Sequence, residues 1–395
     1  QGAAAALMFP QVVSFIQVNF EGDERARAFS SYVAISGLAS ILGQVFGGFL
    51  LAANLFDTGW RGIFLVNVPV GVVALLAAWP LLRESRGAHM RGLDYGGVAL
   101  LTLSLLLLIF PLVQAASTGW SPWLLIYLVL SVPCLIVFLA YEQRTTRQGQ
   151  VPLVQLSLFR QRSFPAGLLT MMVASGLFAA LLFLLAFYLQ TILHLMPLQA
   201  GLVIMSASIS FFLASFLGSV IHTHLGRHSL SAVAALITGG YLLISLSTQW
   251  LVPLWGMPPL LMALFLLGLG MGLLSTLLLP RTLEGVAPDD AGAASGVYTT
   301  GTQVAGSLGV ALIGLVDALT ASSGNPLRAF ITSVLLIVLL SVGLSLTVLP
   351  LAGWRPVSAK KEALVSRQGC TQDNEGETET VHSVEKGTCR SCQNA

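Results

Sequence analysis

The chain has 395 residues, of which 55% are hydrophobic and only 9% charged, and its mean hydropathy is +0.83. Ordinary soluble domains carry roughly 25% charged residues, so this composition excludes a water-covered globular surface. The net charge of +2, spread over many short connections, excludes the basic face of a nucleic-acid-binding protein. We therefore expect an all-α, polytopic membrane protein with the lipid bilayer as its surroundings.

Apolar runs of bilayer-spanning length lie between charged or Pro/Gly-rich breaks along the chain. We predict eleven helices, at 2–19, 29–53, 62–82, 95–115, 123–141, 165–190, 199–221, 229–248, 257–280, 293–319 and 328–351.

The connections between these runs divide sharply by charge. Seventeen of the 19 Lys and Arg residues lie in alternate connections and in the C-terminal tail. The positive-inside rule places those connections and the tail in the cytoplasm and residue 1 on the outer side of the membrane. We expect this membrane to be the plasma membrane. Because the chain starts outside with neither a methionine nor a signal-peptide pattern, we predict a fragment that lacks an odd number of upstream helices.

Two predicted helices carry small residues at every fourth position. Such residues allow membrane helices to approach closely, since Leu against Leu gains little over lipid. One series is Ala39, Gly43 and Gly47, with Gly48 adjoining, and the other is Gly301, Ala305 and Gly309. We expect both to form tight helix contacts.

At these residues the sequence resembles the fourteen-helix drug:proton antiporter branch of the major facilitator superfamily. Ala39-x3-Gly43-Gln44-x2-Gly47-Gly48 is similar to the gating, or antiporter, motif of helix five, although Gln44 stands where the family usually has proline. Trp60-Arg61-x2-Phe64-x2-Asn67-x-Pro69-x-Gly71 resembles the signature of helix six, and Gln303 begins a stretch like helix thirteen. The resemblance covers about residues 1 to 352.

This resemblance implies an architecture. The eleven runs would be helices four to fourteen of fourteen, with the first three absent. The domains would be 1–82, the remainder of an N-terminal bundle; 83–141, two extra helices with a cytoplasmic loop; 142–164, a cytoplasmic interfacial linker; 165–352, a six-helix C-terminal bundle; and 353–395, a disordered cytoplasmic tail.

The resemblance also implies a function, which is proton-coupled efflux of lipophilic or cationic small molecules by alternating access. The partners would then be the bilayer, a small-molecule substrate and protons, with the proton gradient as energy source and no cofactor. The alternatives are a major-facilitator transporter of another solute class and a transport-inactive truncated membrane protein. A membrane enzyme is not expected, because no cluster of His, Asp, Glu or Cys lies at a membrane face. Substrate identity, transport direction and oligomeric state stay open.

Polar and aromatic side chains inside the runs are candidates for a substrate cavity, because adaptable apolar pockets with a few polar groups suit varied lipophilic solutes. The candidates are Gln11, Ser175, Phe178, Gln190, Tyr298 and Gln303. For each alone, helix packing is the competing interpretation. An ionisable group within a bilayer is a functional candidate by default. Asp317 comes closest to being such a group in the predicted helices, and it is therefore the candidate for proton coupling. No metal site is predicted.

Overall fold

The structure is a computed structural model, and the residues that it describes all lie within Gln1–Trp354. The described residues are 2–20, 22–53, 59–81, 94–119, 121–148, 153–154, 158–159, 163–225, 228–284, 286, 290–321 and 326–352. The predictions for the loop at 83–93 and for the tail at 353–395 lie outside these residues.

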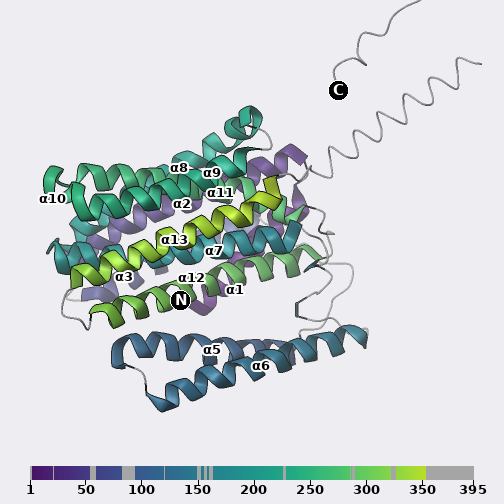
Figure 1. Cartoon of the computed structure of the whole chain (residues 1–395). Helices are drawn as coiled ribbons and strands as arrows, with labels where there is room; N and C mark the ends of the chain where they lie inside the picture. The colour runs from purple at the N-terminus through teal and green to yellow at the C-terminus, as the bar shows by residue number, and fades with distance from the viewer. Residues whose placement is uncertain are drawn as a thin grey trace, which may run out of the picture. The chain divides into compact units, whose positions relative to one another are not determined.

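The described part of the chain is helical and contains no strand (Figure 1). Its elements are α1 (Gly2–Asn19), α2 (Gly22–Ala53), η2 (Gly59–Arg61), α3 (Gly62–Leu65), α4 (Asn67–Leu81), α5 (Tyr95–Thr118), α6 (Pro122–Arg147), α7 (Ser163–Phe187), η4 (Tyr188–Ile192), α8 (Pro197–Leu225), α9 (Ser229–Leu246), η6 (Ser247–Leu251), α10 (Val252–Trp255), α11 (Pro258–Leu283), α12 (Ala291–Ala321) and α13 (Pro326–Ala352).

Each predicted apolar run coincides with helical structure. Ten of the described helices are long and apolar enough to cross a membrane. The first run is the helix α1, whose apolar part, Ala4–Asn19, is shorter, so the count of eleven spans stays a prediction. The all-α membrane fold is confirmed.

The helix predicted at 62–82 is interrupted. A 3₁₀ turn and the short α3 precede α4, and the break falls at Val66. Pro69 explains it, because proline has no N–H and its ring clashes with the carbonyl of the residue four positions earlier, here Leu65, the last residue of α3.

The largest core lies among α7, α8, α9, α11 and α13. Its fully buried side chains include Tyr241, Ile237 and Phe330. Glycines of α11 let the neighbouring helices come close: a Cβ on Gly272 would lie 2.6 Å from Ala214 Cβ of α8, and one on Gly270 would lie 2.7 Å from Ile237 Cγ1 of α9. The sequence analysis did not single out these glycines of α11.

The linker predicted at 142–164 differs from expectation at its start. Residues 142–147 continue α6 to Arg147 instead of beginning a separate segment. Further on, Leu158 is only 4% exposed and packs in a cluster with Phe164 and Leu283. This part of the linker is therefore held by protein contacts. Its interfacial, cytoplasmic placement stays a prediction.

Candidate functional site

The candidate site is built on the turn between α1 and α2. Gly22 has a positive φ of 51°, which favours glycine and reverses the chain within a few residues. The Arg25 Nε donates a hydrogen bond of 2.7 Å to the Phe20 carbonyl oxygen, which satisfies an acceptor at the end of α1. The beginning of α2 is thus fixed to the end of α1.

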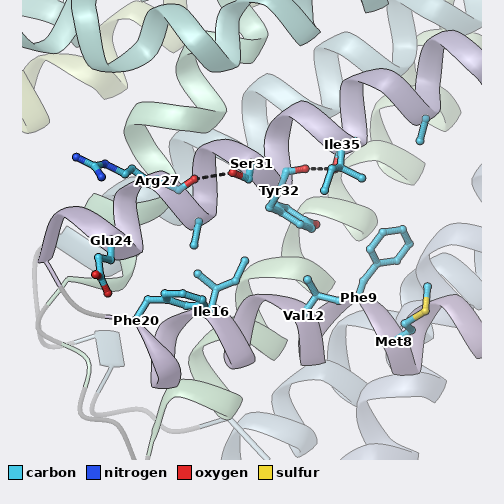
Figure 2. Close-up of a pocket in the computed structure, with 13 residues that line it drawn as sticks. Met8, Phe9, Val12, Ile16, Phe20, Glu24, Arg27, Ser31, Tyr32 and Ile35 are labelled. Carbon is cyan, nitrogen blue, oxygen red and sulfur yellow. Dashed lines mark hydrogen bonds between the residues drawn. The ribbon is translucent and has the colours of Figure 1, made fainter. Parts of the chain in front are cut away.

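Beyond this turn the two helices enclose an apolar groove of about 910 Å³ (Figure 2). Its lining residues recur at helical spacing on one face of each helix, because side chains three and four positions apart lie on the same side. They are Met8, Phe9, Val12, Ile16 and Phe20 of α1 and Glu24, Arg27, Ala28, Ser31, Tyr32, Ile35, Ser36 and Ala39 of α2.

The groove offers few polar groups to a bound molecule. The Ser31 and Ser36 hydroxyls donate to the Arg27 and Tyr32 carbonyl oxygens at 3.0 and 2.8 Å, so their hydrogen-bonding capacity is largely used within α2. Figure 2 shows Glu24 and Arg27 at the end near the interhelical turn, and Met8 and Phe9 at the far end. Apolar solutes would therefore meet a flexible Met and aromatic wall, with charge at one end only.

The helices that line the groove are held to α11 and α12 by buried contacts and hydrogen bonds. Ile16 belongs to a buried cluster with Tyr298 of α12, and Tyr32 packs against the same cluster. The Gln17 Nε2 donates to the Leu283 carbonyl oxygen at 3.1 Å, and the Ser295 Oγ donates to the Pro10 carbonyl oxygen at 3.2 Å. Movement of α11 or α12 would therefore act on α1 directly.

The six predicted cavity residues are not brought together in this groove. Gln11, Gln190 and Gln303 are exposed on α1, η4 and α12. Ser175 and Phe178 are half-buried on α7, where Phe178 packs against the C-terminal core. Tyr298 comes closest, since it lies buried in the cluster behind the groove. Their role in a substrate cavity stays a prediction.

Most residues of the groove are not among the candidates predicted from the sequence. Met8, Phe9, Glu24, Arg27 and Tyr32 were not singled out there. Their spacing within each helix was visible in the sequence, but the apposition of the two faces was not.

The antiporter-like motif lies on α2, which packs along α8. A Cβ on Gly48 would lie 2.8 Å from Leu198 Cδ1 of α8, as expected of a close contact. Among the described residues, however, a Cβ on Gly43 or Gly47 would meet no atom within 4 Å. Ala39 instead lines the groove. The gating role of these residues stays a prediction.

The face of α2 that meets α8 includes Ser40, Gln44 and Gly48, each one position after a member of the predicted series, and also Gly37. A Cβ on Gly37 would lie 2.9 Å from both Phe212 N and Phe212 Cα. The Ser40 and Ser208 hydroxyls are 2.9 Å apart, and Gln44, the departure from the family motif, places its carbonyl oxygen against Gly201.

The predicted small-residue series of α12 does form a tight contact. A Cβ on Gly309 would lie 2.6 Å from the Gly176 carbonyl carbon of α7, and a Cβ on Gly176 would lie 2.9 Å from the Ala305 carbonyl oxygen. Gly301 of α12 faces Leu168 and Met172 of α7. This expectation is confirmed.

The helix-six signature surrounds the break between η2, α3 and α4. Trp60 and Phe64 meet edge to face at 5.9 Å, and the Arg61 guanidinium carbon lies 4.7 Å from the Trp60 ring centroid. The Asn67 Nδ2 donates to the Ile63 carbonyl oxygen at 3.3 Å, across the break that Pro69 causes. A Cβ on Gly71 would meet no described atom within 4 Å. These contacts shape the chain at the start of α4, and among the described residues they enclose no site.

Asp317 is half-buried near the end of α12. The Ser333 Oγ of α13 donates to its Oδ1 at 3.5 Å, so the carboxylate links two helices. Its coupling role stays a prediction.

Comparison with known proteins identifies the fold. Residues 1–310, well over half of the chain, match the Major Facilitator Superfamily. The chain belongs to the Major Facilitator Superfamily. The resemblance noted in the sequence is thereby confirmed at the level of the superfamily, and the chain is an integral membrane protein of a transporter family rather than of an enzyme family.

Relatives within the superfamily are named for transport and for resistance. The probable actinorhodin transporter of Streptomyces coelicolor is 36% identical over 324 residues, which are 80% of this chain and 54% of that protein. The puromycin resistance protein pur8 of Streptomyces alboniger is 32% identical over 80% of this chain and 62% of its own length. The multidrug transporter protein MdtP of Bacillus subtilis is 25% identical over 82% of this chain and 58% of its own length. The chain spans little more than half the length of such relatives.

Proposed function

We propose that this chain is the larger part of a proton-coupled efflux transporter of the multidrug type, and that the groove between α1 and α2 forms part of its path for lipophilic or cationic solutes. The groove carries this proposal, because it is a solute-sized apolar surface on a chain whose relatives include proteins named as an actinorhodin transporter and a multidrug transporter.

The dimensions and chemistry of the groove suit such solutes. Its volume of about 910 Å³ falls within the roughly 300–1,000 Å³ of small-molecule sites. Met8 and Phe9 can repack around differently shaped apolar molecules, while Tyr32 adds one adaptable aromatic face. Glu24 supplies an anionic group for a cationic solute at one end.

The charge distribution supports a specific orientation of the chain in the membrane. We propose that the C-terminus is cytoplasmic and that the protein lies in the cell membrane, because seventeen of the 19 Lys and Arg residues lie in the connections on that side. The turn between α1 and α2 then faces the cytoplasm, so Glu24 meets solutes arriving from inside the cell.

We also assign the chain to one branch of the superfamily. We propose the fourteen-helix antiporter branch, with the described spans as its helices four to fourteen and with α5 and α6 as the two extra helices. The antiporter-like motif of α2 and the signature at Trp60–Gly71 support this assignment. Protons would drive the exchange, with Asp317 as the candidate carboxylate of the described spans.

The test is transport of a fluorescent lipophilic cation into everted vesicles from cells that express the protein, with and without an imposed pH gradient. We expect transport that collapses with the gradient. Transport that ignores the gradient would refute proton coupling. Gradient-driven transport of other solutes alone would favour a transporter of another solute class, and no transport of any solute would favour the inactive alternative.

A variant pair tests the groove itself. Ile35→Trp fills the groove from a side chain that is 67% exposed, and Leu339→Trp makes the same change on α13 at a side chain that is 68% exposed. We expect Ile35→Trp to weaken transport about tenfold, which corresponds to about 1.4 kcal/mol of lost binding, and Leu339→Trp to leave it unchanged. Equal rates in the two variants would remove the groove from the proposal.

A further inference from the structure

Two carboxyl groups meet where α5 begins and α6 ends, and Figure 1 shows these helices side by side. Asp94 is the N-cap of α5, and its Oδ1 accepts a hydrogen bond of 2.8 Å from the Gly97 N–H. The same Oδ1 accepts a second hydrogen bond, of 3.0 Å, from the Tyr141 hydroxyl of α6. The other oxygen, Oδ2, is buried and has no hydrogen-bond partner among the described residues.

Glu142 of α6 resembles Asp94, because only one of its two carboxylate oxygens accepts a hydrogen bond from a described residue. Its side chain is 0% exposed, and its Oε2 accepts a hydrogen bond of 3.3 Å from the Val154 N–H. Its Oε1 is also buried, and no described residue donates a hydrogen bond to it. Two orphaned carboxylate oxygens in one place need an explanation, because an unpaired buried acceptor costs about 1–3 kcal/mol and a buried charge more.

The two orphaned oxygens face the same small space. The point where a Gly97 Cβ would lie is 2.6 Å from Asp94 Oδ2 and 2.8 Å from Glu142 Oε1. Only a glycine at this position leaves the space between them free. The neighbouring Gly96 similarly leaves room for the Tyr141 hydroxyl, which lies 2.6 Å from the corresponding point.

We propose that Asp94 and Glu142 bind one proton between them, and that this proton latches the α5–α6 hairpin to the linker at Val154. With the proton on Glu142 Oε1, that O–H donates to Asp94 Oδ2, and both orphaned oxygens are satisfied at once. The two donors to Asp94 Oδ1, the Gly97 N–H and the Tyr141 hydroxyl, hold that carboxyl group in place beside Glu142.

Within the described part of the chain, the surroundings favour a proton over another positive charge. Arg144 and Arg147, the basic residues in the last turn of α6, have exposed side chains. The α12 helix packs on α5 and carries two titratable side chains, Tyr298 in the cluster behind the groove and Asp317 against Ser333. No group of three or more His, Cys, Asp or Glu that could hold a metal ion occurs among the described residues.

Loss of the proton would place two carboxylates against each other in a buried site, where like charges repel strongly. The pair can relieve this repulsion when Glu142 turns away, and its bond to Val154 then breaks. The linker that follows α6 towards α7 would be released from the hairpin as the pH rises. This latch is independent of the proposed efflux function, because it needs only the α5–α6 hairpin and the linker.

Infrared difference spectroscopy of the purified protein tests proton binding directly. A rise in pH should remove the carbonyl stretching band of a protonated carboxyl group in the wild type. That band should be missing in Glu142→Gln, whose amide can donate to Asp94 Oδ2 and accept from the Val154 N–H without titrating. Hydrogen–deuterium exchange at the Val154 amide should quicken with rising pH more steeply than its intrinsic chemical rate does in the wild type, and should rise only in parallel with the intrinsic rate in Glu142→Gln.

Two further outcomes would overturn the proposal. One is an unchanged infrared band in Glu142→Gln, and the other is a sodium-dependent response at constant pH, which would identify a metal cation in place of the proton. Should Glu142→Gln fail to fold, Asp94→Asn serves instead, because its amide can donate to Glu142 Oε1. That variant should also lose the titrating band, and a retained band would equally refute the shared proton.

Discussion

Substitution of Gly309 by alanine measures how tightly α12 packs on α7. A Cβ at this position would lie 2.6 Å from the Gly176 carbonyl carbon and 2.8 Å from the Gly176 Cα, and these are backbone atoms that cannot rotate away. Overpacking of this kind costs about 1–3 kcal/mol, whereas glycine-to-alanine exchange within a helix gains about 0.5–1 kcal/mol. We expect a net loss of about 1–2 kcal/mol.

The matched control lies three residues away on the same helix. A Cβ on Gly306 would lie 3.7 Å from Ala179 Cβ, an ordinary contact, so Gly306→Ala should be neutral or slightly stabilising. Thermal unfolding of both variants in the same detergent, followed by the loss of the monodisperse peak, should lower the Tm of Gly309→Ala by about 2–4 °C relative to the control. If Gly309→Ala were as stable as Gly306→Ala, the tight α7–α12 contact would be wrong.

Two other substitutions follow from the same structure. Gly37→Ala should destabilise the α2–α8 contact, because its Cβ would lie 2.9 Å from the Phe212 backbone, whereas Gly43→Ala should not. Melting curves of the two variants test this difference. A loss of transport in Gly43→Ala at unchanged stability would support the gating role of the motif. Asp317→Asn should leave the melting temperature unchanged, because the amide oxygen can still accept the hydrogen bond from Ser333. It should abolish transport driven by a pH gradient, and full transport by this variant would exclude Asp317 from coupling.

The predicted helices could be located from the sequence because their cause is local. In a bilayer each backbone polar group must be satisfied within its own helix, so an apolar run of sufficient length is enough to specify a helix. Departures arose where a local feature was underestimated. Pro69 broke the third run, and α6 continued to Arg147 through residues that had been assigned to the linker.

The candidate site was harder to predict, because it depends on which helix faces meet. Tyr298 was identified as a cavity residue but lies behind the groove, while Tyr32 and Glu24, which line it, were missed. Asp94 and Glu142 are 48 positions apart in sequence, and each resembles an ordinary helix-end acid when considered alone. Only the packing of α5 on α6 brings their oxygens together.

By itself the sequence determined the membrane-embedded, all-helical fold, the resemblance to the superfamily, and the tight contact of α12 through Gly309. The tertiary structure alone decided that α2 meets α8 at Gly37, and that an added Cβ on Gly43 or Gly47 would meet no described atom within 4 Å. The physical reason is that spacing of small residues specifies a face suited to close approach, but a neighbouring helix must be present for that approach to occur. Which helix fills which face depends on the packing of all of them together.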